Sequence, residues 1–142
     1  MASSASNKIT YLLATGAVNF SSNTFKIILM QPGFSFDKDS HHYYGNVSGS
    51  ELASGNGYTT GGNTLTGVTV TEDDTYDWTK ILWSNTSWVA SGGNVTASGA
   101  IIINDSGASD PIVGYIDFVG DQTVLDGATF TIANPQVRVK NA

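Results

Sequence analysis

Residues 25–65 of the chain read FKIILMQPGFSFDKDSHHYYGNVSGSELASGNGYTTGGNTL and hold its clearest structural signals. The segment opens with Phe25–Met30, which is apolar on one face and mostly apolar on the other. That pattern predicts a strand that is covered on both faces, by the protein itself or by a partner. The strand should end at Pro32, because proline cannot donate to a ladder. Four glycines close the segment and predict tight turns around Tyr58, namely Gly55, Gly57, Gly61 and Gly62.

Between these ends the sequence predicts one or two short helical turns, near residues 39–54. Asp37 or Asp39 is a suitable N-cap for a short helix through residues 40–44, which Gly45 and Asn46 would end. Ser48 and Glu51 fit the S-x-x-E capping box, in which the Glu51 side chain would reach back to the backbone of Ser48. Glu51 is therefore expected to stabilise a helix end and not to act as a catalytic acid.

The rest of the chain reads as short strands, each bounded by Gly, Asn, Asp or Pro. We expect strands at residues 9–20 (broken near Gly16), 65–70, 78–83, 87–90, 95–104, 112–119, 129–132 and 136–139. Residues 100–103 are continuously apolar, which predicts a central strand. Evenly spaced short strands are typical of an all-β fold, here a single-domain antiparallel β-sandwich or barrel with one or two short helical turns near residues 39–54.

The N-terminus differs in composition from the rest of the chain. Residues 1–8 are small and polar, apart from Met1 and Lys8, and predict a flexible N-terminal arm that neighbouring subunits would order. Residues 9–142 are expected to form a single all-β structural domain. The apolar run after Lys8 is interrupted by polar residues, which favours an amphipathic strand over a secretory signal. No apolar run is long enough to span a membrane.

Composition and charge exclude several classes of function. Charged residues make up 13% of the 142-residue chain, about half the usual share of roughly a quarter. The polar surface must therefore come from Ser, Thr, Asn and Gly, as in turn-rich β proteins. A net charge of −6 disfavours binding to nucleic acid and to anionic membranes. The absence of cysteine excludes disulfides, thiolate zinc sites and thiol catalysis.

Two groups of side chains have the chemistry of metal ligands: His41 and His42 with Asp37 and Asp39, and Glu72, Asp73, Asp74 and Asp77. Adjacent histidines diverge on a helix and cannot face one ion. The acidic group lacks the D-x-D-x-D-G spacing of a preformed calcium loop. We therefore expect caps and solvent-facing residues in the first group, and a solvated hairpin turn in the second.

The sequence contains no pattern typical of an enzyme. It has no G-x-S-x-G, H-E-x-x-H or phosphate-loop motif, and no pair of carboxylates stands out. We assign no catalytic, cofactor-binding or metal-binding residue and expect no cofactor.

Six aromatic residues could form a sugar-stacking surface: Tyr43, Tyr44, Tyr58, Trp78, Trp83 and Trp88. Core packing is the expected role of Trp78 and Trp83, because both lie in a predicted strand. Trp88, among Ser and Asn, is expected to be exposed.

Residues 25–65 also resemble a small all-β structural protein of tailed bacteriophages. The resemblance consists of the pattern F-K-x-x-L-M, F-D-K-D-x-H-x-x-Y, V-S-x-x-E-L and G-x-G-Y-T-x-G-G-x-T-L, carried by Phe25, Lys26, Leu29, Met30, Phe36, Asp37, Lys38, Asp39, His41, Tyr44, Val47, Ser48, Glu51, Leu52, Gly55, Gly57, Tyr58, Thr59, Gly61, Gly62, Thr64 and Leu65. Residues 112–118, IVGYIDF, resemble a second pattern of that family, "IGYVDF". The match covers about the middle third of the chain and one late strand.

The resemblance implies a non-enzymatic structural component of the virion, with capsid decoration (cement) as the favoured role. A neck or tail location, or a carbohydrate- or receptor-binding module at the tail tip, stays open as an alternative. The implied partners are the major capsid protein or other virion structural proteins, together with further copies of the chain in a homo-oligomer. The resemblance implies no catalytic residue, cofactor, nucleic acid or membrane.

Overall fold

The computed structural model describes residues 2–106 and 109–140. Met1 of the predicted arm, and residues 107–108 and 141–142 of the predicted domain, lie outside the described residues. The described chain is mostly strand, with antiparallel sheets and two short α-helices, as predicted for an all-β fold. Its elements are β1 (Ala2–Ala5), α1 (Asn7–Ala14), β2 (Phe25–Met30), α2 (Tyr44–Val47), the 3-10 turn η1 (Ser48–Ser50), β3 (Asn63–Thr64), β4 (Thr69–Asp73), β5 (Trp78–Leu82), β6 (Thr86–Val89), β7 (Val95–Asn104), β8 (Ile112–Val124), β9 (Thr129–Ile132) and β10 (Gln136–Lys140).

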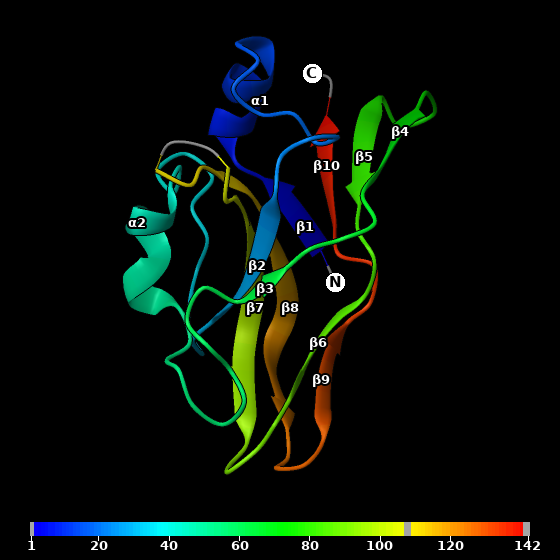
Figure 1. Ribbon diagram of the computed structural model, residues 1–142. Coiled ribbons are helices and arrows are strands. Elements are labelled where there is room, and N and C mark those ends of the chain that lie inside the picture. Colours follow the sequence, from blue (N-terminus) through cyan, green and yellow to red (C-terminus); the bar gives the residue numbers. More distant parts are fainter. Residues whose placement is uncertain (1, 107–108, 141–142) are drawn as a thin grey trace.

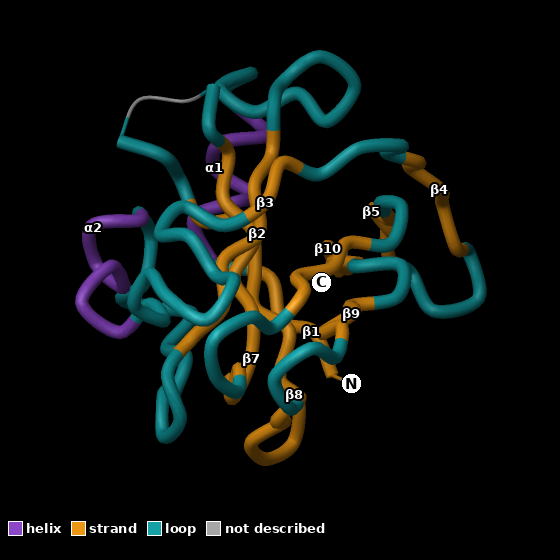
Figure 2. Tube along the Cα trace, turned by 60° about the horizontal axis from the view of Figure 1, so that its bottom comes forward, coloured by secondary structure: helices purple, strands orange, loops and turns teal. Residues whose placement is uncertain are grey.

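The strands form two layers. One layer is a five-stranded antiparallel sheet in the order β1-β8-β7-β2-β3. The other consists of a three-stranded sheet, β10-β5-β4, and a two-stranded sheet, β6-β9. Figure 1 shows the two layers side by side, and Figure 2 shows β4, β5, β9 and β10 on one side of the larger sheet. The predicted central strand is confirmed, because β7 occupies the middle of the larger sheet.

Strand β2 is covered on both faces, as its sequence predicts. Phe25, Ile27 and Leu29 point into the core between the layers, while Ile28 and Met30 point into a second core on the opposite face. The second core is closed by α2 and by residues of the preceding loop, and α2 lies against that side of the sheet in Figure 1. The chain itself therefore supplies both covers, and burial of each large side chain contributes about 1.5–3 kcal/mol.

Helix α1 replaces the strand expected at residues 9–20. Ile9, Leu12 and Leu13 recur at the i, i+3, i+4 spacing of a helical face, and the first two are buried in the core. The Ser6 side chain caps the helix by accepting a hydrogen bond from the Lys8 amide at 3.3 Å. The strand prediction was wrong because the apolar residues of this segment follow the helical period of 3.6 and not the strand period of two.

The described part of the expected flexible arm consists of strand β1, the capping residue Ser6 and the first two residues of α1. Residues 2–5 pair with β8 from Ala2 opposite Asp117 to Ala5 opposite Gly114. The next amide, that of Ser6, donates to the Val113 carbonyl at 3.0 Å. Small side chains suffice here because the ordering cost is offset by backbone hydrogen bonds to a sheet edge and not by apolar burial.

The strand predicted at residues 65–70 is wrong over residues 65–68, which form no strand, and only Thr69 and Val70 lie in β4. Asn63 and Thr64 pair with β2, whereas β4 begins at Thr69 and pairs with β5. Gly67 lies between them with φ +67°. A positive φ favours glycine and turns the chain out of the extended conformation, so one strand cannot run through this position.

Candidate functional site

Glu51 is the most deeply buried carboxylate among the described residues, with 4% of its surface exposed. Its Oε2 accepts hydrogen bonds from the Tyr58 hydroxyl at 2.6 Å and from the Gly61 amide at 2.7 Å. Its Oε1 accepts a hydrogen bond from the Tyr44 hydroxyl. A buried charge is tolerated when it is matched by donors in this way. We call this group the Glu51 cluster.

The Glu51 cluster corrects the capping-box prediction. A capping box would need a helix that begins after Ser48 and contains Glu51. Instead, the 3-10 turn Ser48–Ser50 ends before Glu51, and α2 ends before Ser48. The Glu51 side chain therefore points into the protein, away from the backbone of Ser48. The expected position of short helical structure within residues 39–54 is confirmed, while the role of Glu51 in it is wrong.

Tyrosine hydroxyls in this cluster are held as hydrogen-bond donors. Burial, together with the hydrogen bond to Glu51, raises the pKa of Tyr44 to about 12. The same two causes raise the pKa of Tyr58 further. The Tyr58 hydroxyl also accepts a hydrogen bond from the Leu29 amide at 3.1 Å, which ties the loop to β2. The cluster therefore joins the loop around Tyr58 and Gly61 to β2.

The glycines of the G-x-G-Y-T-x-G-G segment allow close approach of two backbones. A Cβ atom at Gly62 would lie 1.8 Å from the Ile27 carbonyl oxygen. A Cβ atom at Gly57 would lie 1.9 Å from the Val89 carbonyl oxygen. Both glycines also have positive φ, so the predicted tight turns are confirmed and have a packing reason as well.

His41 has a structural place. Its Nδ1 accepts a hydrogen bond from the Asp37 amide at 3.0 Å, and its ring stacks on Phe34 with centroids 5.7 Å apart. Asp37 caps a turn at residues 37–40, and the backbone amide of Asp39 holds its pKa below the usual range. The helix expected at residues 40–44 starts instead at Tyr44. Within residues 2–106 and 109–140, no group of three metal-binding side chains comes together.

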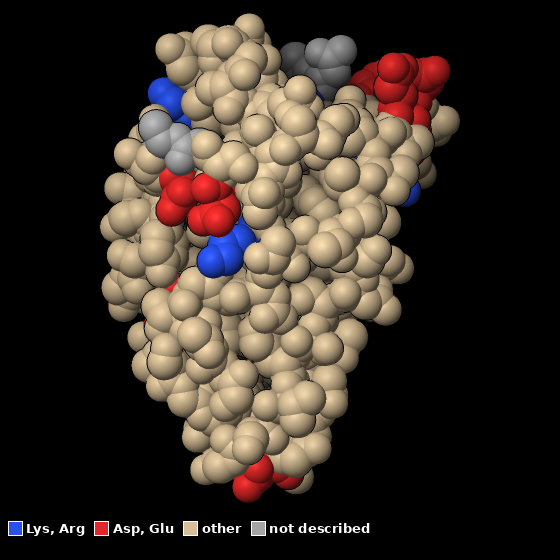
Figure 3. Space-filling view, in the orientation of Figure 1, with Lys and Arg blue, Asp and Glu red and all other residues tan. Residues whose placement is uncertain are grey.

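The predicted hairpin turn lies at residues 74–77, between β4 and β5, and Glu72 and Asp73 are the last two residues of β4. Asp73 pairs with Trp78 at the end of the ladder, and its Oδ1 accepts hydrogen bonds from the amides of Thr75 and Tyr76 at 3.0 and 3.2 Å. Figure 3 shows these acidic side chains at one corner, while most of the visible face carries no charge.

Of the six aromatic residues that could form a sugar-stacking surface, Tyr58, Trp83 and Trp88 are buried, whereas Trp78, which was expected in the core, is only half-buried. Trp83 and Trp88 are 1% and 5% exposed, so the expectation that Trp88 is exposed was wrong. Trp88 lies opposite Phe130 in the β6–β9 ladder, and its ring packs on Tyr58 at 5.9 Å. Burial of Trp88 comes from a strand pairing distant in sequence, which the flanking Ser and Asn residues do not indicate.

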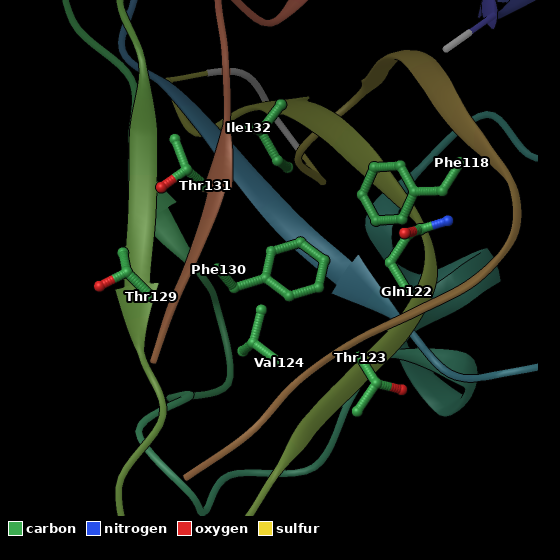
Figure 4. Close-up of a pocket in the computed structure, with 8 residues that line it drawn as sticks. All are labelled: Phe118, Gln122, Thr123, Val124, Thr129, Phe130, Thr131 and Ile132. Carbon is green, nitrogen blue, oxygen red and sulfur yellow. The ribbon is translucent and has the colours of Figure 1, made fainter. Parts of the chain in front are cut away.

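An uncharged groove of about 510 Å³ runs between β8 and β9. Its apolar part consists of Phe118, Val124, Phe130 and Ile132. Its polar rim consists of Gln122, Thr123, Thr129 and Thr131, all exposed. In Figure 4 the Phe130 ring points from β9 toward Phe118 and Gln122 on β8. We call this feature the β8–β9 groove.

Both strands that border the β8–β9 groove have an edge without a partner strand in the described part of the chain. β9 pairs with β6 alone. The pairing of β8 with β1 stops at Asp117, before the residues that line the groove. An unpaired strand edge beside an apolar floor is a place where an extended segment can add.

No protein-family model, curated protein or solved structure matches this chain. Its function is therefore argued from its own residues. Over the described residues, no helix is long and apolar enough to cross a membrane.

Proposed function

We propose that this chain is a non-enzymatic structural component of a tailed-bacteriophage virion, acting as a capsid decoration protein. The β8–β9 groove is the observation that carries the proposal, because it offers a docking surface whose described lining residues include no ionisable side chain. The resemblance of residues 25–65 and 112–118 to a phage structural family supports the same role.

A non-enzymatic role is supported by what the family-like residues do. Glu51 and Tyr58 hydrogen-bond to each other in the core, and Gly62 lies against the backbone of β2. The side chains and backbones of these three residues are engaged in the fold. They serve as scaffold, and a scaffold with low surface charge suits many copies packed on a lattice.

The docking partner we propose for the β8–β9 groove is an uncharged, extended segment of the major capsid protein. None of the described residues that line the groove is ionisable, so a charged segment would lose solvation there without gaining a partner. The free edge of β9 offers backbone donors and acceptors, and Phe118 and Phe130 offer an apolar floor. Strand addition uses both at once: backbone pairing provides affinity and side-chain pockets provide register.

The decisive measurement is the copy number of this protein in purified particles. Quantitative mass spectrometry should find hundreds of copies per virion if the protein decorates the capsid. A handful of copies per virion would indicate a location in the neck or tail. The absence of the protein from purified particles would refute the virion role.

The docking role is tested by placing a charge in the groove. Gln122→Glu keeps the size of an exposed side chain on β8 but adds a buried charge when a segment docks. We expect this variant to lose incorporation into particles while its melting temperature is unchanged. Gln136→Glu, the same substitution on β10 outside the groove lining, is the control and should incorporate normally. Equal incorporation of both variants would exclude the groove as the docking surface.

A further inference from the structure

A second hollow, of about 380 Å³, lies where β1, β7 and β8 meet the loop after β2. It shares no described lining residue with the β8–β9 groove. Its volume lies in the range of small-molecule sites, roughly 300–1,000 Å³. We call it the Asp121 pocket, after the carboxylate at its rim.

Three aromatic rings form one side of the Asp121 pocket. Phe36 stacks on Tyr115 with centroids 5.3 Å apart, and Phe34 meets Tyr115 edge-on at 5.6 Å. The two phenylalanines are half-buried, so part of each ring faces outward. Tyr115 is packed closely against β7: a Cβ atom at Gly99 would lie 2.3 Å from its hydroxyl. The rings therefore form a rigid apolar wall.

Carboxylates and hydroxyls form the other side of the Asp121 pocket. Asp117 and Asp121 are both exposed, and Ser4 and Ser98 lie beside them. Asp117 accepts one hydrogen bond, from the Val119 amide to Oδ1 at 2.8 Å. Among described residues, no protein donor reaches the other oxygen of Asp117 or either oxygen of Asp121, and no lysine or arginine lines the pocket.

A large β-bulge creates this arrangement. Residues 118–121 of β8 stand opposite the single residue Ser98 of β7, between the pairs Ala97–Gln122 and Gly99–Asp117. Val119 and Gly120 have φ +56° and +110° inside the bulge. Bulges commonly redirect side chains toward a binding site, and here the bulge brings Asp121 to the rim of the aromatic wall.

We propose that the Asp121 pocket binds a neutral saccharide. Saccharide hydroxyls would donate to the free oxygens of Asp117 and Asp121, and charge-assisted hydrogen bonds of this kind are the stronger ones. The C–H face of a sugar ring would pack on Phe34 and Phe36, as apolar surfaces do on aromatic rings. Two carboxylates with no cation beside them among the described residues exclude sulfated and uronic acid sugars.

A neutral sugar fits the pocket better than a simple cation does. An ammonium group can contact the carboxylates and a ring face, but it has no acceptor atom for a serine hydroxyl proton. A polyhydroxyl ligand engages all three kinds of group, since the exposed Ser4 hydroxyl can both donate and accept, while Ser98, which donates to the Gln31 carbonyl at 2.7 Å, can still accept. The inference stands apart from the proposed virion role, which rests on a different groove.

The test is a glycan array of neutral, N-acetylated, sulfated and uronic acid oligosaccharides, probed with the purified full chain. Titration calorimetry then measures the best neutral glycan, with spermidine as the cationic comparison. Wild type should bind at least one neutral glycan and none of the anionic ones. The double variant Asp117→Asn/Asp121→Asn should weaken that binding about tenfold or more, because charge-assisted hydrogen bonds become neutral ones.

The control is Asp105→Asn, which changes the same group on an exposed turn after β7, outside the pocket. It should bind like wild type, and all three proteins should melt at similar temperatures. The proposal is overturned if no neutral glycan binds, if the double variant binds as well as wild type, or if spermidine is the ligand that the double variant loses. Each of these outcomes is independent of the copy number in particles.

Discussion

Glu51 and Tyr58 meet in the interior of the protein, with the tyrosine hydroxyl 2.6 Å from the Oε2 atom of the carboxylate. The same hydroxyl accepts a hydrogen bond from the Leu29 amide, so one tyrosine joins the glycine-rich loop to β2. The two hydrogen bonds of the Tyr58 hydroxyl place the polar Glu51 cluster beside the apolar strand β2. Helix capping and core hydrogen bonding are two different roles for Glu51, and they predict different losses in the free energy of unfolding when Glu51 or Ser48 is replaced.

Glu51→Ala should lower the free energy of unfolding by about 3 kcal/mol, because the buried Tyr58 hydroxyl and the half-buried donors of Tyr44 and Gly61 lose their acceptor. Urea unfolding followed by tryptophan fluorescence measures the change. Ser48→Ala is the matched control: a capping box would make it costly, whereas Ser48 is exposed here and should be close to neutral. A large loss at Ser48 together with a small loss at Glu51 would restore the capping box.

Stability should fall with pH above about 10. The pKa of Tyr44 is about 12 in the folded protein against an ordinary value of 10.0, so the unfolded chain ionises first. A pKa raised by folding gives stability that is complete below pH 10 and is lost between pH 10 and 12. Tyr44→Phe should show a shallower decline across this range in urea titrations at each pH. Parallel curves for the two proteins would show that Tyr44 is not the group responsible.

Gly62→Ala should destabilise the protein by at least about 3 kcal/mol, combining a left-handed backbone with overpacking. The added methyl would collide with the Ile27 carbonyl, which is backbone and cannot move aside cheaply. Gly45→Ala is the control, since a Cβ there meets nothing within 4 Å and the position lies in α2. That change should be neutral or stabilising by up to about 1 kcal/mol. Thermal melts of both variants compare the two sites directly.

Removal of residues 1–5 should lower the free energy of unfolding by about 1–3 kcal/mol, because β8 loses its partner at that edge. Hydrogen exchange supplies the complementary measurement on the intact chain. Amides paired between β1 and β8 should be protected in the isolated protein. Fast exchange of these amides, with no loss of stability on truncation, would show that residues 2–5 are a flexible arm in the isolated protein.

Several elements could be predicted from local pattern alone. The apolar runs Phe25–Met30 and 100–103, and the short alternating segments that became β5, β6, β9 and β10, lie in strands. Period and turn chemistry act over a few residues, so a single stretch carries the information. The positions of the tight turns at Gly57 and Gly62 were predictable for the same reason.

Tertiary structure alone decided the roles of the polar and small residues. Glu51 matched a capping motif, but which donors reach its carboxylate depends on how the loop folds over β2. Trp88 is buried because its strand, β6, pairs with β9. The small residues 2–5 form a strand because they pair with the edge of β8. The Asp121 pocket also joins elements that are distant in sequence, namely β1, β7, β8 and the loop after β2, whereas the β8–β9 groove lies between consecutive strands. The hydrogen bonds and the burial of these residues depend on partners that are distant in sequence. A local sequence pattern covers only a few neighbouring residues and therefore does not identify those partners.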